Sequence, residues 1–201
     1  MHQTALTKLL RGVALASAIT LTALPLLAQR AEAQTLRIAM SLSEVPTLWA
    51  APSGGFEGAR FGGYTLFDPL VSWDMSSADQ PSGLVPALAE SWTVDPDNPK
   101  RWIFTLREAQ FHDGSPWNAD AAIWNLDGFL NRDAPHFHPN RAGQAGARTQ
   151  SIASYGKIDD RTIFIETKTV NSLLLFELST LFFASKARYE ELGSWEEFAM
   201  N

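Results

Sequence analysis

The sequence predicts a mixed α/β fold of the α+β kind, and three observations lead to this prediction. Stretches in which apolar and polar residues alternate occur in pairs, and each pair is separated by a short cluster of turn residues. Stretches with apolar residues three and four positions apart follow these pairs, as is typical of helices. An apolar content of 45% over 201 residues is sufficient to form a buried core.

The first 33 residues have the features of an export signal. A short basic start precedes an apolar run at residues 12–28, and Ala31-Glu32-Ala33 then supplies the small-residue pattern at which signal peptidase cuts. We therefore expect residues 1–33 to be a cleavable signal peptide and the mature chain to begin at Gln34. The alternative is an uncut membrane anchor, but the run is slightly short for a span and contains Pro25.

The mature chain is acidic and has no cysteine. Without residues 1–33 it carries 13 basic and 21 acidic residues, a net charge of −8. The absence of a basic cluster argues against nucleic acid as a partner, because phosphates need Lys and Arg. The absence of cysteine excludes disulfides, thiol chemistry and cysteine metal sites. These features predict a soluble protein of a bacterial periplasm.

The first half of the mature chain is expected to contain a strand, a loop, a short helix and a hairpin. Residues 35–41 alternate and predict a strand, whereas residues 42–64 are rich in Gly, Pro and Ser and predict a long loop. Residues 86–91 fit a short helix that starts at a proline. The alternating residues 92–94 and 102–106 flank a turn cluster, which predicts a β-hairpin.

The stretch "REAQFHDGSPWNADAAIWNLDGFL" predicts a strand, a corner and a helix. Asp113-Gly114 is a turn dipeptide and Pro116 lacks a backbone donor, so the chain turns there. Asn118 is then a suitable cap for a helix at residues 119–130. An acid/base pair of His112 and Asp113 is the functional alternative, but adjacent strand residues point to opposite faces and rarely meet one substrate atom.

The last third is expected to contain a loop, a second hairpin and two helices. Residues 131–150 are polar and glycine-bearing, which predicts an exposed loop. Residues 152–166 form a second alternating pair that turns at Asp159-Asp160. The continuous apolar run at residues 171–183 predicts a buried helix, and a final helix follows at residues 186–199.

Two further groups of side chains could bind a ligand. His136 and His138 would share one face of a strand and invite Zn or Ni, but no third ligand is near them in the sequence, so a polar loop is the preferred interpretation. The seven tryptophans could form a sugar platform, although Trp92 and Trp102 fall on the buried sides of strands. A secreted glycan hydrolase would also need two carboxylates flanking a cleft, and no spacing here indicates such a pair.

Four segments carry a resemblance to a known family. The chain contains, in order, "FDPLVSWD", "GLVPALAESWTVD", "RWIFTLREAQFHDGSPWNAD" and "FFASKARYEELG". In order and spacing these are similar to the family 5 extracellular solute-binding proteins, the receptors of ABC importers for oligopeptides, dipeptides, opines and nickel. The chain departs from the family pattern at residues 120–123, where the family usually reads D-D-V, and it ends at Asn201, where family members continue.

The resemblance implies a partial clamshell of the periplasmic-binding-protein type II kind. Residues 34–63 would be a strand and loop of the first lobe, residues 64–201 would lie mostly in an additional amino-terminal subdomain, and the second lobe would be absent. It also implies a monomeric receptor without cofactor, metal or catalytic residue. Its partners would be a small-molecule or oligopeptide ligand and the ABC permease subunits at the inner membrane, where a separate subunit hydrolyses ATP.

The loop after the first strand supplies the predicted ligand-binding residues. They are Ser43, Glu44, Thr47 and Trp49. A loop at the carboxyl end of a strand commonly borders an α/β cleft, Glu44 could pair with a ligand ammonium, and Trp49 could stack on the ligand. The alternative is that Trp49 belongs to the core and that Glu44 is solvated. A truncated product without a function of its own is a further alternative.

Overall fold

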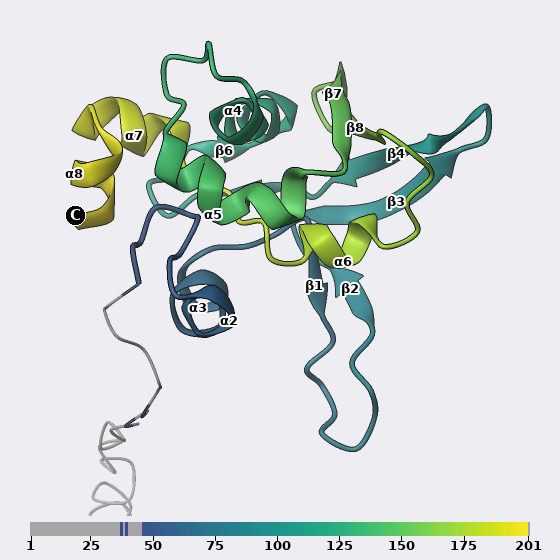
Figure 1. Cartoon of the computed structure of the whole chain (residues 1–201), viewed down its shortest axis with the longest axis horizontal. Helices are drawn as coiled ribbons and strands as arrows, with labels where there is room; N and C mark the ends of the chain where they lie inside the picture. Colours follow the sequence, from purple (N-terminus) through teal and green to yellow (C-terminus); the bar gives the residue numbers. More distant parts are fainter. Residues whose placement is uncertain (1–36, 38, 40–45, 201) are drawn as a thin grey trace, which may run out of the picture. The chain divides into compact units, whose positions relative to one another are not determined.

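The computed structural model describes residues 37, 39 and 46–200. The expected signal peptide, nearly all of the expected first strand, and Ser43 and Glu44 lie outside these residues. The described elements, in chain order, are α2 Gly55–Gly58, the π-helical turn η2 Ala59–Gly63, α3 Tyr64–Leu66, β1 Val71–Trp73, β2 Leu84–Pro86, β3 Ala89–Asp95, β4 Asn98–Leu106, β5 Ala109–Gln110, β6 Pro116–Trp117, α4 Ala119–Leu130, α5 Pro139–Thr149, β7 Ile152–Asp159, β8 Thr162–Thr167, α6 Leu174–Leu178, α7 Lys186–Leu192 and α8 Trp195–Met200 (Figure 1). The mixed α/β prediction is confirmed.

A four-stranded antiparallel sheet in the order β3-β4-β8-β7 is built from the two predicted hairpins. Ile163 and Ile165 of β8 lie opposite Phe104 and Trp102 of β4, and both isoleucines and Phe104 are fully buried. The alternation of apolar residues therefore gives the sheet one core face. Both outer pairings, β3 with β4 and β7 with β8, contain register shifts.

Helix α4 packs against β7 and β8 and begins where the sequence predicted. The side chain of Asn118 accepts a hydrogen bond from the backbone N–H of Ala121 at 2.9 Å, which satisfies one of the free amides of the first turn. Gly114, at the corner before it, has a φ of 82°, a conformation that a glycine adopts readily. The hydroxyl of Tyr155 in β7 donates to Asp127 in α4 at 2.8 Å and joins the helix to the sheet.

The short helix expected at residues 86–91 is absent, because this segment pairs with another part of the chain. Pro86 ends β2, which pairs with β1 in a small arm whose loop extends away from the sheet (Figure 1). The next two amides, of Ala87 and Leu88, donate to the carbonyls of Leu70 and Pro69 at 3.3 and 3.0 Å. These tertiary hydrogen bonds replace those of a helix.

The expected loop at residues 42–64 is helical in its second half. Residues 55–66 form α2, η2 and α3 in succession. Their glycines allow close packing: a Cβ on Gly63 would lie 2.3 Å from the ring of Phe182, and one on Gly58 would lie 1.7 Å from the carbonyl oxygen of Ser53. Glycine here permits close approach of a helix.

The expected exposed loop at residues 131–150 contains helix α5. Pro139 occupies the first helical position, which suits a residue without a backbone N–H. The buried side of the helix is formed by Arg141, Ala145 and Thr149, which are four residues apart. An arginine, an alanine and a threonine form no apolar stripe, so the sequence pattern gave no helix signal.

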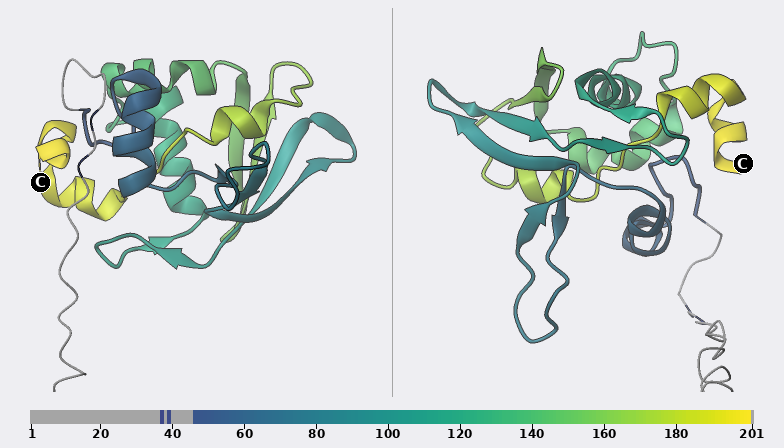
Figure 2. Two further views of the ribbon diagram at one scale, coloured as in Figure 1. Left: turned by 90° about the horizontal axis from the view of Figure 1, so that it is seen from below. Right: turned by 180° about the vertical axis from the view of Figure 1, so that it is seen from behind.

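The two carboxyl-terminal helices of the prediction are shorter than expected. Within residues 171–183 only α6 is helical, and residues 181–184 form a buried segment that continues past Phe182, which bridges to Pro69. Gly193, with a φ of 81°, ends α7 and divides the expected last helix into α7 and α8. Figure 2 shows these two helices at the opposite end of the described fold from the β3–β4 hairpin.

Among the residues that the structure describes, no helix has both the length and the apolar composition to span a membrane.

Candidate ligand-binding site

The segment from Thr47 to Ser53 is held in one conformation by its own polar groups. The backbone N–H of Thr47 donates to the hydroxyl of Ser53, and the N–H of Ser53 donates to the hydroxyl of Thr47, both at 3.3 Å. Ala50 between them has a φ of 58°, which is unusual for a residue with a side chain. These hydrogen bonds hold the segment in a defined conformation, with Trp49 at its centre.

A pocket of about 370 Å³ lies between this segment and the start of helix α5. Its walls are formed by Thr47, Trp49, Ser53, Pro139, Asn140, Gly143 and Gln144. The hydroxyls and side-chain amides among these residues can both donate and accept hydrogen bonds, and none of the residues carries a charge. The pocket can therefore receive a polar, uncharged group, such as a peptide bond, beside the edge of an indole.

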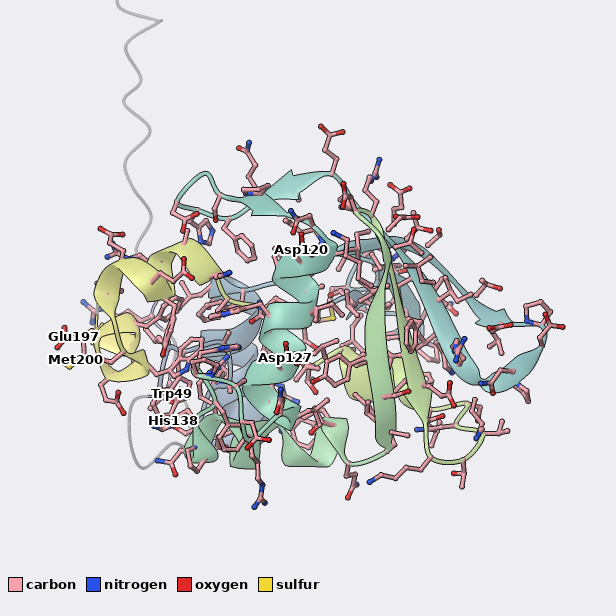
Figure 3. The ribbon with its side chains drawn as sticks, turned by 90° about the horizontal axis from the view of Figure 1, so that it is seen from above. Trp49, Asp120, Asp127, His138, Glu197 and Met200 are labelled. Carbon is pink, nitrogen blue, oxygen red and sulfur yellow. The ribbon has the colours of Figure 1, made fainter. Side chains whose placement is uncertain are left out.

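The indole of Trp49 forms a buried part of the wall of this pocket. Its side chain is 8% exposed, and its Nε1 donates to the carbonyl of Ala51 at 2.9 Å. The imidazole of His138 lies against it, with ring centroids 5.0 Å apart and an angle of 51° between the rings (Figure 3). A ligand in the pocket would meet only a small part of the indole.

His138 connects this wall to helix α8. Its Nε2 lies 3.2 Å from a carboxylate oxygen of Glu196, and its buried Nδ1 has no hydrogen-bond partner among the residues that the structure describes. His136, two residues earlier, stacks on Trp124 at 4.3 Å, and its Nε2 lies 2.6 Å from the carbonyl of that residue. Burial lowers the pKa of His136, which favours the neutral ring.

The two histidines do not form a metal site together, because each has separate partners. Among residues 37, 39 and 46–200, no group of three or more His, Asp or Glu side chains could hold a metal ion.

The predicted ligand-binding residues are thus placed in part. Thr47 and Trp49 meet in one pocket, whereas Ser43 and Glu44 lie outside the described residues. Sequence reasoning missed Asn140, Gly143 and Gln144, which come from α5, about ninety residues further along the chain. The pattern of α5 gave no helix signal, so nothing in the sequence indicated that this segment would meet Trp49.

A second pocket, of about 390 Å³, lies beside the Asp113 corner. Apolar side chains including Phe111, Trp117 and Phe198 line most of it. The carboxylate of Asp113 accepts hydrogen bonds from the N–H and the hydroxyl of Ser115 at 2.8 and 2.6 Å, and a further one from the hydroxyl of Ser185. Burial alone would raise the pKa of Asp113, but these hydrogen bonds outweigh it and lower the pKa. This carboxylate holds structure and stays ionised, so it is poorly suited to accept or deliver a proton near neutral pH.

The chain was compared with protein families and with curated proteins. The model described as bacterial extracellular solute-binding proteins, family 5 Middle, matches residues 83–201, more than half of the chain. A putative ABC transporter peptide-binding protein of Brucella ovis is 32% identical over 136 residues, which are 63% of this chain and 23% of the relative. The nickel-binding periplasmic protein of Escherichia coli is 30% identical over 100 residues, which are 46% of this chain and 18% of the relative. The chain thus spans less than a quarter of the length of these relatives.

Solved structures share the fold. HbpA2 from Haemophilus parasuis aligns with a TM-score of 0.64 and 20% identity, over 79% of this chain and 33% of that one. MoaA from A. tumefacien R10, in complex with mannopinic acid, aligns with a TM-score of 0.60 and 25% identity, over 78% of this chain and 30% of that one. DppA from Helicobacter pylori, in complex with the peptide STSA, aligns with a TM-score of 0.60 and 19% identity, over 76% of this chain and 31% of that one. Each alignment takes in most of this chain and about a third of the other.

Proposed function

Because this chain belongs to the bacterial extracellular solute-binding proteins of family 5, we propose that it is the amino-terminal part of the substrate-binding component of an ABC importer for peptides or peptide-like solutes. The names of its relatives support the solute class, since they include a putative peptide-binding protein and a receptor solved with a peptide. The expected signal peptide supports a periplasmic location.

The proposed division of the chain follows the sequence prediction. Residues 34–63 would belong to the first lobe and residues 64–201 mostly to an additional subdomain, with none of the second lobe among these residues. The coverage of less than a quarter of the curated relatives supports this proposal. The receptor would act as a monomer, would deliver its ligand to permease subunits, and would catalyse no reaction.

The ligand would lie against the wall formed by Thr47 and Trp49. The observation that carries this assignment is that two predicted ligand-binding residues meet helix α5 in one pocket, although about ninety residues separate them from it. Solute sites commonly combine apolar surface with a few polar groups that converge, and this wall has both. Ser43 and Glu44 precede the wall in the chain and remain predicted ligand-binding residues.

The test is to read the genomic DNA beyond the codon for Asn201 and to purify the product of the whole reading frame. Calorimetric titration with a panel of di- and tripeptides should show saturable binding. Thr47→Ala and Trp49→Ala should each weaken the binding by about tenfold or more, ~1.4 kcal/mol. Lys157→Ala, which removes an exposed ion pair between β7 and Asp120 of helix α4, serves as the control variant and should leave the affinity unchanged. A stop codon directly after Asn201, or turnover of a peptide or glycan by the product, would contradict the proposal.

A further inference from the structure

We infer that Arg141 is a positioning residue that sets the place of Trp49 in the ligand wall and couples this wall to helix α8. The role in ligand binding rests on the proposed function, whereas the coupling itself is a property of the fold. Arg141 lies on the buried side of α5 and is fully buried, so it acts through its neighbours.

The contacts of the guanidinium join three parts of the chain. Its Nε donates to the backbone carbonyl of Trp49 at 2.9 Å. Its Cζ lies 3.3 Å from the centroid of the Trp195 ring in α8 and 4.7 Å from that of Phe129 in α4. The planar guanidinium therefore lies against two aromatic rings, and its Nε–H holds the backbone carbonyl of Trp49 in place.

The charge of Arg141 has an unusual environment. Its Nη1 and Nη2 are buried without hydrogen-bond partners, and no ion pair to it is formed within the described part of the chain. Burial lowers the pKa of Arg141 to about 9. A buried cation without a carboxylate is costly, and here the faces of two aromatic rings and the carbonyl of Trp49 offset part of the cost. Such a residue contributes little to stability through its charge, which favours a role that depends on its shape.

A second connection runs parallel to the first. The Nε1 of Trp195 donates to the carbonyl of His136 at 2.7 Å, and His138 lies between Trp49 and Glu196 of α8. Trp49 is thus joined to α8 through Arg141 and through His138. A displacement of Trp49 by a ligand would be transmitted to α8 mainly through Arg141, because that connection is fully buried, whereas the contact of His138 with Glu196 is exposed.

The experiment uses fluorine NMR of the chain labelled with fluorotryptophan, without any ligand. The chain has seven tryptophans, and the resonances of Trp49 and Trp195 are assigned from Trp49→Phe and Trp195→Phe. Arg141→Met, which keeps the bulk and removes the guanidinium, should shift the resonances of both Trp49 and Trp195. If that variant does not fold, Arg141→Lys takes its place, since an ammonium cannot reproduce the flat stack.

The matched control is Arg148→Met on the same helix. Arg148 donates to Thr180 and to the carbonyl of Gln144, at 3.0 and 2.7 Å, and forms no hydrogen bond with Trp49 or Trp195. Its replacement should move neither resonance.

The Trp195→Phe variant tests the coupling between Trp49 and helix α8. In Trp195→Phe the resonance of Trp49 should move, although the two residues belong to different elements. An unmoved Trp49 resonance in both Trp195→Phe and the Arg141 variant would overturn the inference. Because no solute is added, this failure would leave the peptide-binding proposal intact, and failure of peptide binding would leave the coupling intact.

Discussion

The hydroxyl of Ser185 donates a hydrogen bond to the carboxylate of Asp113, which lies 72 residues earlier in the chain. The same hydroxyl accepts from the N–H of Arg188 at 3.1 Å and so caps helix α7. Asp113 thus orients the cap of a helix that it does not belong to, and the turn dipeptide Asp113-Gly114 has a second role that its local sequence does not reveal.

Replacement of Asp113 is expected to destabilise both structures that it joins. Asp113→Ala removes an acceptor from Ser115 and from Ser185, and should lower the free energy of unfolding by about 1–3 kcal/mol. Urea denaturation followed by far-UV circular dichroism measures this change. Asp79→Ala in the exposed loop between β1 and β2 is the control, with an expected effect within about 0.5 kcal/mol. Equal effects of the two variants would show that the link to Ser185 adds nothing.

The contribution of Asp113 is expected to depend on pH in a defined direction. Its pKa in the folded chain is below the ordinary value of 3.8, because the hydrogen bonds to the carboxylate outweigh the effect of burial. The stabilisation is therefore fully present above the unfolded-state pKa and is lost as the pH falls through the lower, folded-state pKa. The stability difference between the native chain and Asp113→Asn should be constant from pH 5 to 7 and shrink below about pH 4. A difference that grows in acid would contradict this account.

Asn125 is expected to be indispensable for the buried segment at residues 181–184. Its side chain accepts from the N–H of Ala184 at 2.8 Å and donates to the carbonyl of Ala184 at 2.9 Å, and the residue is fully buried. Asn125→Leu would leave both backbone groups unpaired, at a cost of about 2–4 kcal/mol. Thermal unfolding measured by calorimetry tests this. Asn131→Ala, at the exposed residue that ends α4, removes a single exposed hydrogen bond from the N–H of Asp133 and should change the stability by less than about 1 kcal/mol.

Two glycine substitutions are expected to have opposite signs. Gly63→Ala would place a methyl group 2.3 Å from the ring of Phe182, which is buried and cannot move away, so the chain should lose about 1–3 kcal/mol. Gly146→Ala, in α5, meets no atom within 4 Å and should gain about 0.5–1 kcal/mol, because alanine favours the helix. Urea unfolding of both variants under one condition tests the pair. A stable Gly63→Ala would mean that the helical segment at residues 55–66 can shift away from Phe182.

The parts of the fold that the sequence predicted are those whose burial uses apolar side chains. Trp102, Phe104 and Leu106, like Ile163 and Ile165, recur at every second position, so both hairpins were correctly predicted. The helical residues 55–66 pack through glycine, and α5 packs through Arg141, Ala145 and Thr149, so neither produces an apolar period. The missed helices are therefore a consequence of the kind of side chain that they bury.

At the candidate site, too, some residues could be proposed from the sequence and others could not. Thr47 and Trp49 could be proposed from their place after an expected strand, because position in the chain was enough. Their partners Asn140 and Gln144 could not, since a contact between segments so far apart depends on the tertiary fold. The apolar run at residues 171–183 shows the converse error, because its composition indicated a helix. Instead, the N–H groups of Phe183 and Ala184 donate to the carbonyl of Asp68 and to the side chain of Asn125, which hold them in another conformation.

The register shifts in the outer strand pairs have a consequence for behaviour at high concentration. Within the part of the chain that the structure describes, β3 and β7 are the outer strands of the sheet and each has one unpaired side. An unpaired side of a strand can recruit a strand of another molecule. Bulge-like irregularities in the pairing of both strands distort the spacing of amides and carbonyls that such recruitment requires. The two edges of the sheet are therefore expected to be poor templates for polymerisation.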